Sequence, residues 1–499
     1  MLPMSTIWPW SSRACATSVI KTDKLKLKII FIALLALALI GSVQASTIQS
    51  GQDVQTAINS AKAGDIIIVG SGNINTFEVD KPLTIAGQSG SILKAAIQKP
   101  AIKINSDGVK IIGFRIIGVG KDTNAKFDYY MQNPDAASGK RLDQPNSAIL
   151  VNANNVYIEN TIIFGAQAGL KATNADNLTL KNVTLESCES GAALTKCFDG
   201  RIENCSFSNC EKFGLDAEQC SNIFLQGNRI VNTSSAGALI KDSEKCSVLE
   251  NTFSQNTFGL SLWKTTKSQV LRNQVDHNYY GILITQNSNN NTIADNMAED
   301  NSRSEIVTGF GIGISLQENS SYNIVFRNTA TGNFNGLEAS KGCKYNAFLG
   351  NNATDNKHGI RMNENRNNVI FGNNFYNNNI NAYENASLNI WNTTIGNYYS
   401  DYQGKDENGD GIGDQSYSIP GQDSSTRDFF PLTRPYREAS LNTSTINDAL
   451  AKYAVYGLAY NEIPVYRKQG GTIVISSQPR TSPPKWSNSQ PLDVNTPPY

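Results

Sequence analysis

Histidine is nearly absent from this chain, with two in 499 residues, and neither sign of charge is in excess, since 43 basic residues balance 43 acidic ones. A net charge of zero gives no reason to expect binding to nucleic acid or to an anionic membrane surface. The eight cysteines include no Cys-x-x-Cys pair, which argues against a zinc site. Apart from one apolar run near the start, no segment is long enough to act as a membrane anchor.

Helical spacing is also absent between Ser147 and Tyr383, where a glycine returns every 22 or 23 residues, with one gap of 32. In each repeat the first and third residues after the glycine are apolar and the second and fourth are mostly polar, as in a strand. An asparagine recurs at a similar spacing. The repeat glycines are Gly169, Gly191, Gly214, Gly237, Gly259, Gly281, Gly313, Gly336 and Gly359. The repeat asparagines are Asn160, Asn182, Asn204, Asn228, Asn251, Asn273, Asn296, Asn328, Asn351 and Asn373.

This period predicts a solenoid. The unit is shorter than the 40 or so residues of a propeller blade and lacks the dense leucine frame of leucine-rich repeats. A coil of about 22 residues with short strands and polar turns fits an all-β, parallel β-helix, in which each coil pairs with the next. Asparagine suits such coils because it tolerates the left-handed backbone of sharp corners and can stack in amide ladders.

The repeat and its two flanks resemble the NosD and carbohydrate-binding/sugar-hydrolase type of PbH1-repeat protein, over roughly residues 47 to 434. The segments that carry the resemblance outside the repeats are 48–58, 63–69, 79–87, 396–402, 406–414, 419–421 and 428–432. The resemblance implies a right-handed, single-stranded parallel β-helix with an N-terminal cap. It also implies a link to copper, because NosD proteins are associated with maturation of a copper site. Two histidines on distant coils and five methionines argue against direct copper binding.

Three regions follow along the chain. Residues 1–45 form a signal region, with lysines, a 12-residue apolar run from Ile29 to Ile40 and a small-residue cleavage site before Ser46. Residues 46–437 form the β-helix domain, with its cap at 47–63. Residues 438–499 form an extension with a short helix around 446–456 and a disordered, proline-rich tail. We therefore expect a secreted or cell-surface protein, periplasmic if the source has an outer membrane, without a transmembrane segment in the mature chain.

Four cysteines are expected to stack on neighbouring coils, Cys188 with Cys210 and Cys197 with Cys220. At the spacing of adjacent coils, about 4.8 Å, each pair is within disulfide reach. The alternative is a ladder of small apolar side chains in the core. The odd number of cysteines after the signal region argues against a complete disulfide framework.

Two insertions interrupt the coils, at 121–145 and 300–310, and both lie just before a repeat glycine position, held by Ser147 in the first case. They therefore leave the same corner, separated by about seven coils or about 34 Å. Insertions on one face of a solenoid often mark the binding face. The first insertion carries Tyr129 and Tyr130, which we count as candidate ligand-binding residues.

The outward positions after each glycine hold the strongest candidates for catalytic residues. Asp216 and Glu218 face the same way along one strand, and Lys241 lies one coil beyond Glu218. Paired carboxylates can serve glycoside hydrolysis, so these three are candidate catalytic residues. The alternative is a solvated face with an ion pair worth under about 1 kcal/mol. On the same columns, Trp263, Glu338 and Arg361 are candidate ligand-binding residues, and the motifs of polygalacturonases and alginate epimerases are not seen.

The segment 406–414 reproduces most of a calcium loop. Asp406, Asn408, Asp410 and Asp414 supply oxygen ligands and Ile412 a backbone carbonyl, whereas Tyr417 stands where an EF-hand has its bidentate glutamate. The sequence thus allows calcium as a cofactor, and the alternative is a connector rich in Asx turns.

The leading hypothesis is a NosD-like protein that binds an extended ligand, an extracellular polysaccharide or envelope component, on a lateral face without catalysis. The alternatives are a polysaccharide lyase or glycoside hydrolase of the β-helix type, and a purely structural envelope protein.

Overall fold

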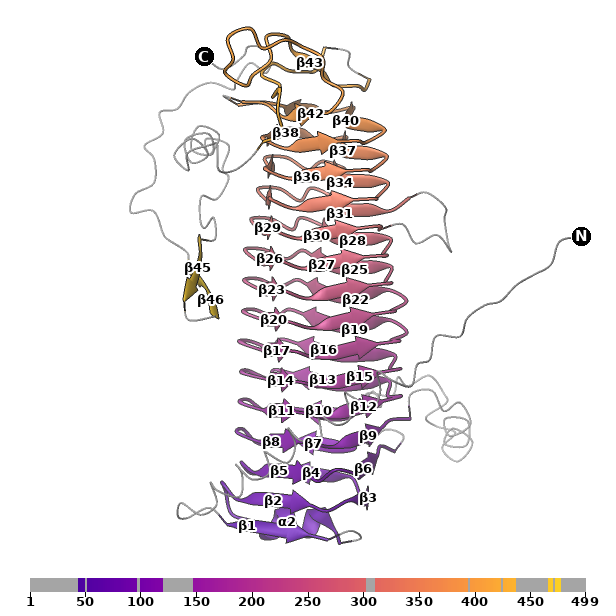
Figure 1. Ribbon diagram of the computed structural model, residues 1–499. Helices are drawn as coiled ribbons and strands as arrows, with labels where there is room; N and C mark the ends of the chain where they lie inside the picture. The colour runs from indigo at the N-terminus through magenta and orange to yellow at the C-terminus, as the bar shows by residue number, and fades with distance from the viewer. Residues whose placement is uncertain are drawn as a thin grey trace, which may run out of the picture.

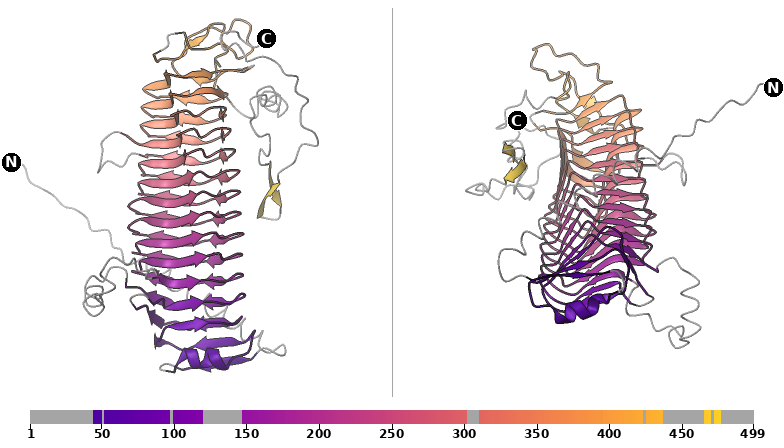
Figure 2. Two further views of the ribbon diagram at one scale, coloured as in Figure 1. Left: turned by 180° about the vertical axis from the view of Figure 1, so that it is seen from behind. Right: turned by 60° about the horizontal axis from the view of Figure 1, so that its bottom comes forward.

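A parallel β-helix makes up most of the protein (Figure 1). The structure is a computed structural model that describes residues 44–49, 52–96, 99–119, 147–301, 310–393, 395–422 and 425–436, and the strands at 465–469 and 472–476. The coils stack along one axis, and each full coil supplies one strand to each of three parallel sheets of 15, 13 and 14 strands (Figures 1 and 2). The predicted right-handed, all-β solenoid is confirmed.

The strands of each sheet stack in register. The 15-stranded sheet contains β1 (Ala45–Ile48), β2 (Ile66–Val69), β5 (Thr84–Gly87), β8 (Lys110–Ile112), β11 (Tyr157–Glu159), β14 (Thr179–Lys181), β17 (Arg201–Glu203), β20 (Phe224–Gln226), β23 (Ser247–Leu249), β26 (Gln269–Leu271), β29 (Thr292–Ala294), β32 (Ile324–Phe326), β35 (Ala347–Leu349), β38 (Arg366–Phe371) and β41 (Leu388–Ile390). The 13-stranded sheet contains β4 (Phe77–Val79), β7 (Ile102–Ile104), β10 (Ser147–Val151), β13 (Ala168–Thr173), β16 (Ser190–Thr195), β19 (Phe213–Glu218), β22 (Ala236–Lys241), β25 (Phe258–Trp263), β28 (Tyr280–Thr285), β31 (Ile312–Leu316), β34 (Asn335–Ser340), β37 (His358–Asn363) and β40 (Ile380–Asn385). The 14-stranded sheet contains β3 (Gly72–Ile74), β6 (Ser91–Lys94), β9 (Arg115–Ile117), β12 (Ile162–Phe164), β15 (Thr184–Glu186), β18 (Ser206–Ser208), β21 (Arg229–Val231), β24 (Thr252–Ser254), β27 (Gln274–Asp276), β30 (Met297–Glu299), β33 (Thr329–Thr331), β36 (Asn352–Thr354), β39 (Asn374–Tyr376) and β42 (Tyr398–Tyr399).

The first coil carries the one helix of the described residues, α2 (Val54–Ser60). Its N-cap Asp53 accepts hydrogen bonds from the backbone N–H groups of Gln55 and Thr56, and the helix buries Val54 and Ile58. After the last coil, β43 (Tyr417–Ser418) pairs antiparallel with β44 (Arg427–Asp428). A separate hairpin joins β45 (Val465–Gln469) and β46 (Thr472–Ser476). No helix in the described part of the chain is long and apolar enough to cross a membrane.

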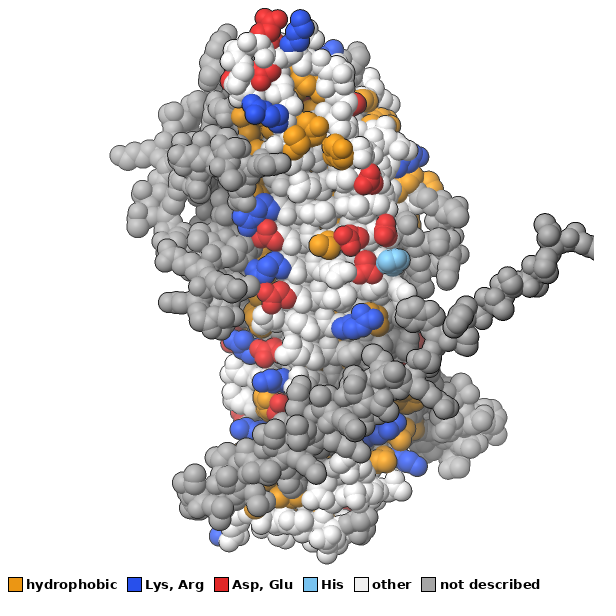
Figure 3. Space-filling view, in the orientation of Figure 1, with side chains coloured by type: hydrophobic (Ala, Val, Ile, Leu, Met, Phe, Trp, Pro, Cys, Tyr) orange, Lys and Arg blue, Asp and Glu red, His pale blue; other side chains and the backbone are white. Residues whose placement is uncertain are grey.

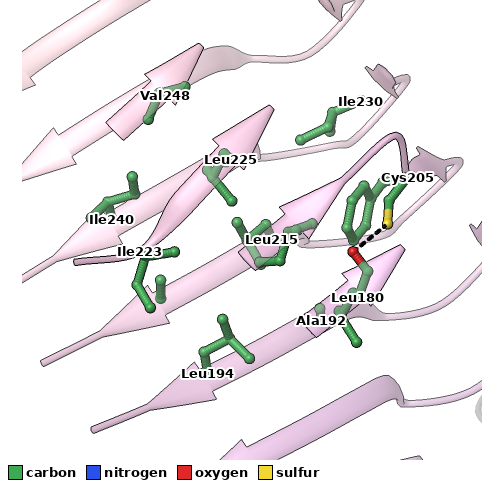
Figure 4. Close-up of a cluster of buried hydrophobic side chains, with 14 of the residues drawn as sticks. Leu180, Ala192, Leu194, Cys205, Leu215, Ile223, Leu225, Ile230, Ile240 and Val248 are labelled. Atoms are coloured by element: carbon green, nitrogen blue, oxygen red, sulfur yellow. Dashed lines mark hydrogen bonds between the residues drawn. The ribbon is translucent and has the colours of Figure 1, made fainter. Parts of the chain in front are cut away.

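The interior is one continuous apolar core. Leu194, Leu215 and Ile240 enter it from the 13-stranded sheet and meet residues of the 15-stranded sheet such as Leu225 and Val248 (Figure 4). These side chains are at most 2% exposed. Because a single coil cannot bury its own apolar face, the stacking of coils is what stabilises each one.

The repeat positions are glycine because a side chain there would have no room. A Cβ at Gly281 would lie 2.5 Å from the carbonyl oxygen of Gly313 on the next coil and 2.8 Å from the Val275 side chain. The same conflict recurs at Gly191 and Gly259, where the carbonyl of the next coil would lie 2.4 and 2.5 Å away. The glycine and the residue after it therefore both face the interior, and the simple alternation of the strand is interrupted there.

The asparagine repeat comprises two different columns. Asn160, Asn182 and Asn204 have φ values of about +50° and form sharp corners. From Asn228 onward the repeat asparagine is the next residue in the coil and is buried, at most 2% exposed. In this buried column each amide nitrogen donates to the side-chain oxygen of the next coil, for example from Asn251 Nδ2 to Asn273 Oδ1 over 3.0 Å. The prediction that the ten repeat asparagines form a single column was therefore wrong.

Two further asparagine ladders run through the later coils. The first contains Asn256, Asn278, Asn301, Asn333, Asn356 and Asn378. The second contains Asn291, Asn323, Asn346, Asn368 and Asn389. In both, the side-chain amide bonds to the next coil at 2.8–3.1 Å. These ladders pair buried polar groups that would otherwise be left without partners.

Cysteines also stack in the earlier coils, and Cys205 precedes Asn228 in the buried asparagine column, because its backbone N–H donates to Asn228 Oδ1. The backbone N–H groups of Glu211 and Ser221 donate to the carbonyls of Cys188 and Cys197, which places Cys210 and Cys220 on the neighbouring coils. All four side chains lie in the apolar core. The predicted stacking of these cysteines on neighbouring coils is confirmed. They form the ladder of small apolar side chains in the core that was the alternative to disulfide bonds.

Both insertions precede strands of the 13-stranded sheet. The first ends before β10 and the second before β31, seven strands later in the sheet order, as predicted. The strand register aligns Ser147 with Ala168, so Ala148, and not Ser147, occupies the position of Gly169. Residues 1–43, 120–146, 302–309, 437–464 and 477–499 lie outside the described residues, so the signal region, the helix around 446–456 and the disordered tail stay predictions.

Candidate ligand-binding site

The outward face of the 13-stranded sheet brings Asp216, Glu218, Lys241, Trp263, Glu338 and Arg361 onto one surface. In register, Glu218 pairs with Lys241, and Lys241 with Trp263. Farther along the same sheet, Glu338 pairs with Arg361. Asp216 on β19 and Glu338 on β34 are five strands apart, which corresponds to about 24 Å. The predicted catalytic and binding residues thus form two groups on one face.

The first group is held by an ion pair. Lys241 Nζ lies 2.6 Å from Glu218 Oε1 and 3.8 Å from Asp242 Oδ2. The hydrogen bond to Glu218 raises the pKa of Lys241. Burial, and next the charge of Glu218, raise the pKa of Asp216 to about 6, while Lys241 opposes this change. A carboxyl group with such a pKa exchanges protons near neutral pH, as a general acid requires. Trp263 is 39% exposed beside this group.

The second group lines a cavity of about 560 Å³. Its residues come from β28, β31, β34, β37 and β40 and from the turns that lead into them. Polar residues include Gln317, Asn335, Glu338, His358 and Arg361, and aromatic residues include Tyr279, Tyr280, Phe310, Phe334 and Tyr383. A cavity of this size with convergent polar groups is the usual form of a site for a small molecule or a sugar unit.

Glu338 is the most deeply buried charged group of this cavity, at 4% exposed. Its Oε2 accepts a hydrogen bond of 2.6 Å from Asn335 Nδ2 and lies 3.6 Å from Arg361 Nη1. Its Oε1 accepts from Ser315 Oγ and Gln317 Nε2, each at 3.4 Å. Burial raises the pKa of Glu338, against the lowering effect of Arg361. This network holds the Glu338 carboxylate in one orientation beside Arg361.

His358 is held in a defined tautomer. Its Nδ1 lies 2.9 Å from Asn335 Oδ1, and because Asn335 Nδ2 donates to Glu338, the Asn335 oxygen is the atom that faces the imidazole. An amide oxygen only accepts, so Nδ1 carries the proton and Nε2 remains an acceptor. Burial, followed by the charges of Arg361 and Lys357, lowers the pKa of His358 to about 4. His358 is therefore neutral at physiological pH.

Aromatic rings form the walls of the cavity. Tyr279 and Tyr280 meet edge to face with centroids 5.0 Å apart, and Phe310 lies 4.8 Å from Phe334. His358 contacts both Phe334 and Tyr383, with centroids at 5.7 Å in each case. Packed rings of this kind present flat apolar surface next to polar groups.

Tyr280, Asn335 and His358 were missed in the sequence because they precede a repeat glycine. Only the positions after the glycine were counted as outward. The interruption of the strand at each glycine turns the preceding residue outward as well, and these three align in one column with Phe258 and Ile312. The signal was present as the pairs Phe258-Gly259 and Tyr280-Gly281. Tyr129 and Tyr130 lie outside the described residues, so their predicted role stays a prediction.

In the predicted calcium loop, the acidic side chains accept hydrogen bonds from backbone N–H groups of the loop itself. Asp406 accepts from the N–H groups of Asp410 and Gly411 at 3.1 and 2.9 Å, and Asp414 accepts from Glu407 at 2.8 Å. Asn408 Nδ2 donates to Asp410 Oδ2, whose other oxygen accepts from the N–H of Ile412. These contacts are those of a connector rich in Asx turns. Calcium binding by the loop stays a prediction.

The lateral surface seen in Figure 3 is mainly uncharged. Acidic and basic side chains alternate along one edge of it, and the described residues of this view gather no broad region of one sign (Figure 3). Ion pairs of this kind join Arg272 to Glu250 at 2.9 Å and Arg327 to Asp295 at 2.8 Å.

A sequence comparison with known families finds the model described as "Periplasmic copper-binding protein (NosD)" at residues 101–304 and 228–404. These matches cover more than half of the chain. The chain belongs to the NosD family. The resemblance seen in the sequence is thereby confirmed, although no curated protein matches the chain at a significant level.

Solved structures resemble this chain at low sequence identity. The A-module of a mannuronan C-5 epimerase from Azotobacter vinelandii is 12% identical, with 67% of this chain and 91% of that one covered and a TM-score of 0.47. The surface protein and adhesin PfbA of Streptococcus pneumoniae is 14% identical, with 70% and 100% covered and a TM-score of 0.45. The pre-mature gene product 12 of bacteriophage phi29 is 12% identical, with 65% and 51% covered and a TM-score of 0.50. Its likeness to this NosD-family chain concerns the fold alone.

The family description names copper, and the described residues do not fit a copper site. His277 follows β27 and His358 begins β37, three coils farther on, a rise of about 14 Å, so they cannot share one ion. Burial raises the pKa of the Cys205 thiol to about 12, and Met362 is fully buried in the core. Among the described residues, no group of three or more histidine, cysteine or acidic side chains is placed to hold a metal ion.

Proposed function

We propose that this NosD-family protein is exported and binds an extended polysaccharide, without catalysis, along the outward face of the 13-stranded sheet. The observation that carries the proposal is the cavity around Glu338, with its aromatic walls and its fixed polar floor, on the same face as the exposed Trp263. Sugars offer hydroxyl groups to side chains such as Glu338 and Arg361 and C–H surfaces to aromatic rings.

The spacing of these groups suits a chain rather than a single sugar. Trp263 on β25 and Tyr383 on β40 are five strands apart in the sheet, or about 24 Å. The cavity extends along this face from β28 to β40 and includes Tyr383, and Trp263 lies on β25, the strand before β28. A polymer that runs along the solenoid axis would meet a ring at each end of this interval and the polar floor in the middle.

The test is retention of the full chain on a panel of immobilised polysaccharides. We expect Trp263→Ala and Tyr383→Ala each to weaken the affinity for the retained polymer about tenfold, which corresponds to about 1.4 kcal/mol. Phe164→Ala and Tyr376→Ala are the matched controls, because these rings are 42% and 45% exposed on the 14-stranded sheet. Equal loss in the controls would place binding elsewhere. No retention on any polymer would favour a purely structural envelope protein.

A second candidate is a polysaccharide lyase or glycoside hydrolase. It is favoured by Asp216, whose pKa of about 6 suits proton transfer, next to Glu218 and Lys241. Mass spectrometry of the same polymers after incubation, with and without calcium, tests it. Shortened products, or products lighter by one water, would establish catalysis, and their persistence in Asp216→Asn would exclude Asp216 from it.

A further inference from the structure

The outward face of the 15-stranded sheet carries an apolar column that is closed to solvent. We name the outer apolar stripe the side chains of Leu249, Leu271, Ala294, Phe326, Leu349 and Phe371, which stack in register on successive strands. They alternate with interior residues such as Val270 and Phe348, and they form a cluster separate from the main core. Their exposed fractions are only 0–5%.

The stripe begins abruptly. In the same column the three preceding strands carry Lys181, Glu203 and Gln226, and Leu249 follows directly on the next strand. Outward positions of a solvated sheet are normally polar, as in these earlier coils. The change therefore indicates that something covers the sheet from β23 to β38, an interval of five strand spacings or about 24 Å.

The neighbouring corner supplies part of the cover. The guanidinium of Arg327 lies over the ring of Phe326, 4.3 Å from its centroid. Phe224, Ile324, Ile390 and Ile395 pack against the stripe from the same face. Leu271 and Ala294 are nevertheless fully buried, and the described strands that carry them contact mainly their neighbours in the same sheet.

The chain itself arrives at one end of the stripe. The backbone N–H of Tyr436 donates to Asn374 Oδ1 at 2.6 Å, and Asn374 Nδ2 donates to the Tyr436 carbonyl at 3.0 Å. The Tyr436 ring lies against Gly372, the residue after Phe371 of the stripe. At Tyr436, the described chain therefore reaches the last member of the stripe.

We propose that residues 446–460 dock on the outer apolar stripe as an amphipathic helix. Ile446, Leu450 and Tyr453 recur at helical spacing, and Thr445 with Asp448 gives the pattern of a helix start. Fifteen residues of helix from 446 to 460 span about 22 Å, close to the length of the stripe. The segment thus has the length, the apolar pattern and the starting point that the stripe requires. The stripe lies on the 15-stranded sheet, whereas the proposed polysaccharide site lies on the 13-stranded sheet. The docking proposal therefore does not depend on the proposed function.

The test is cysteine cross-linking in the full chain. Ala294→Cys is combined in turn with Ala449→Cys, Leu450→Cys, Tyr453→Cys and Val455→Cys, and the oxidised protein is mapped by mass spectrometry. Ser206→Cys, at an outward position of the 14-stranded sheet, replaces Ala294→Cys in the control series. We expect intramolecular cross-links from position 294, strongest for partners on the face that includes Leu450 and Tyr453, and several-fold weaker ones from position 206.

Other results would overturn the proposal. Cross-links between two molecules would assign the stripe to a second copy of the chain, and equal yields from positions 294 and 206 would mean that the segment does not dock. A second measurement uses Leu450→Asp in the otherwise unchanged full chain. It should increase binding of a hydrophobic dye, whereas Lys452→Asp, on the opposite face of the helix, should not.

Discussion

Replacement of one buried asparagine tests whether the ladders hold the later coils together. The side chain of Asn296 makes four hydrogen bonds. Its Oδ1 accepts from Asn273 N and Asn273 Nδ2, both at 2.9 Å, and its Nδ2 donates to the Val270 carbonyl at 2.8 Å and to Asn328 Oδ1 at 2.9 Å. Asn296→Ala removes all four hydrogen bonds. It leaves the buried backbone N–H of Asn273 without its acceptor, Asn296 Oδ1.

The expected loss follows from these contacts. A buried donor left without its acceptor costs about 1–3 kcal/mol, and each of the other three hydrogen bonds contributes about 0.5–1.5 kcal/mol. Because neighbouring amides readjust in part, we expect Asn296→Ala to lower the free energy of unfolding by about 3–5 kcal/mol. Asn296→Asp should be at least as damaging, since its second oxygen would face the Val270 carbonyl and Asn328 Oδ1, which are both acceptors.

Asn182→Ala is the matched control, because it belongs to the same apparent repeat in the sequence. Asn182 is an exposed corner residue with φ of +52° and one side-chain bond of 3.3 Å to Asn160. Its replacement should cost about 1–2 kcal/mol for the left-handed backbone. The measurement is urea denaturation followed by circular dichroism. If Asn296→Ala cost no more than Asn182→Ala, the ladder would not be the stabilising element that its geometry suggests.

Three further outcomes are expected. Burial raises the pKa of Asp428 to about 7, so the folded state keeps a proton that the unfolded chain releases, and the free energy of unfolding should fall as pH rises from about 4 to about 7; Asp428→Asn should remove this slope in denaturation curves. Gly281→Ala should lower the melting temperature much more than Gly409→Ala, where φ is +73° but nothing lies within 4 Å. If the Asp-rich loop binds calcium, millimolar calcium should raise the melting temperature of the native chain and not of Asp406→Ala; no calcium heat in calorimetry would discard the metal.

The sequence predicted the architecture because its period is repeated many times. Each repeat glycine reports the same steric conflict with the next coil, as at Gly281, and so the spacing alone identified the solenoid. The two asparagine columns were harder to separate. They differ by one position in the coil, and the only sign of the change is the gap of 24 residues between Asn204 and Asn228 where 22 or 23 is usual.

The candidate site was predicted only in part. Glu338 and Arg361 stood out as charged residues on an outward column, and the cavity contains both. The burial of Glu338 depends on Asn335, Ser315 and Gln317 from its own and the preceding coil, and a column of single positions does not contain that information. The column before the glycines was missed because a local break in strand alternation cannot be read from a strict period of two.

The ladders also determine how such a protein can change its length in evolution. A duplicate of residues 251–272 placed after Arg272 would present Asn251 and Asn256 again at the positions where the next coil now presents Asn273 and Asn278. Such a duplication adds one turn without breaking any column. It would also move Lys241 away from the cavity around Glu338 by about 4.8 Å. If the face binds a polymer as proposed, the spacing between contacts on the two sides of a duplicated coil would change in steps of one coil, about 4.8 Å.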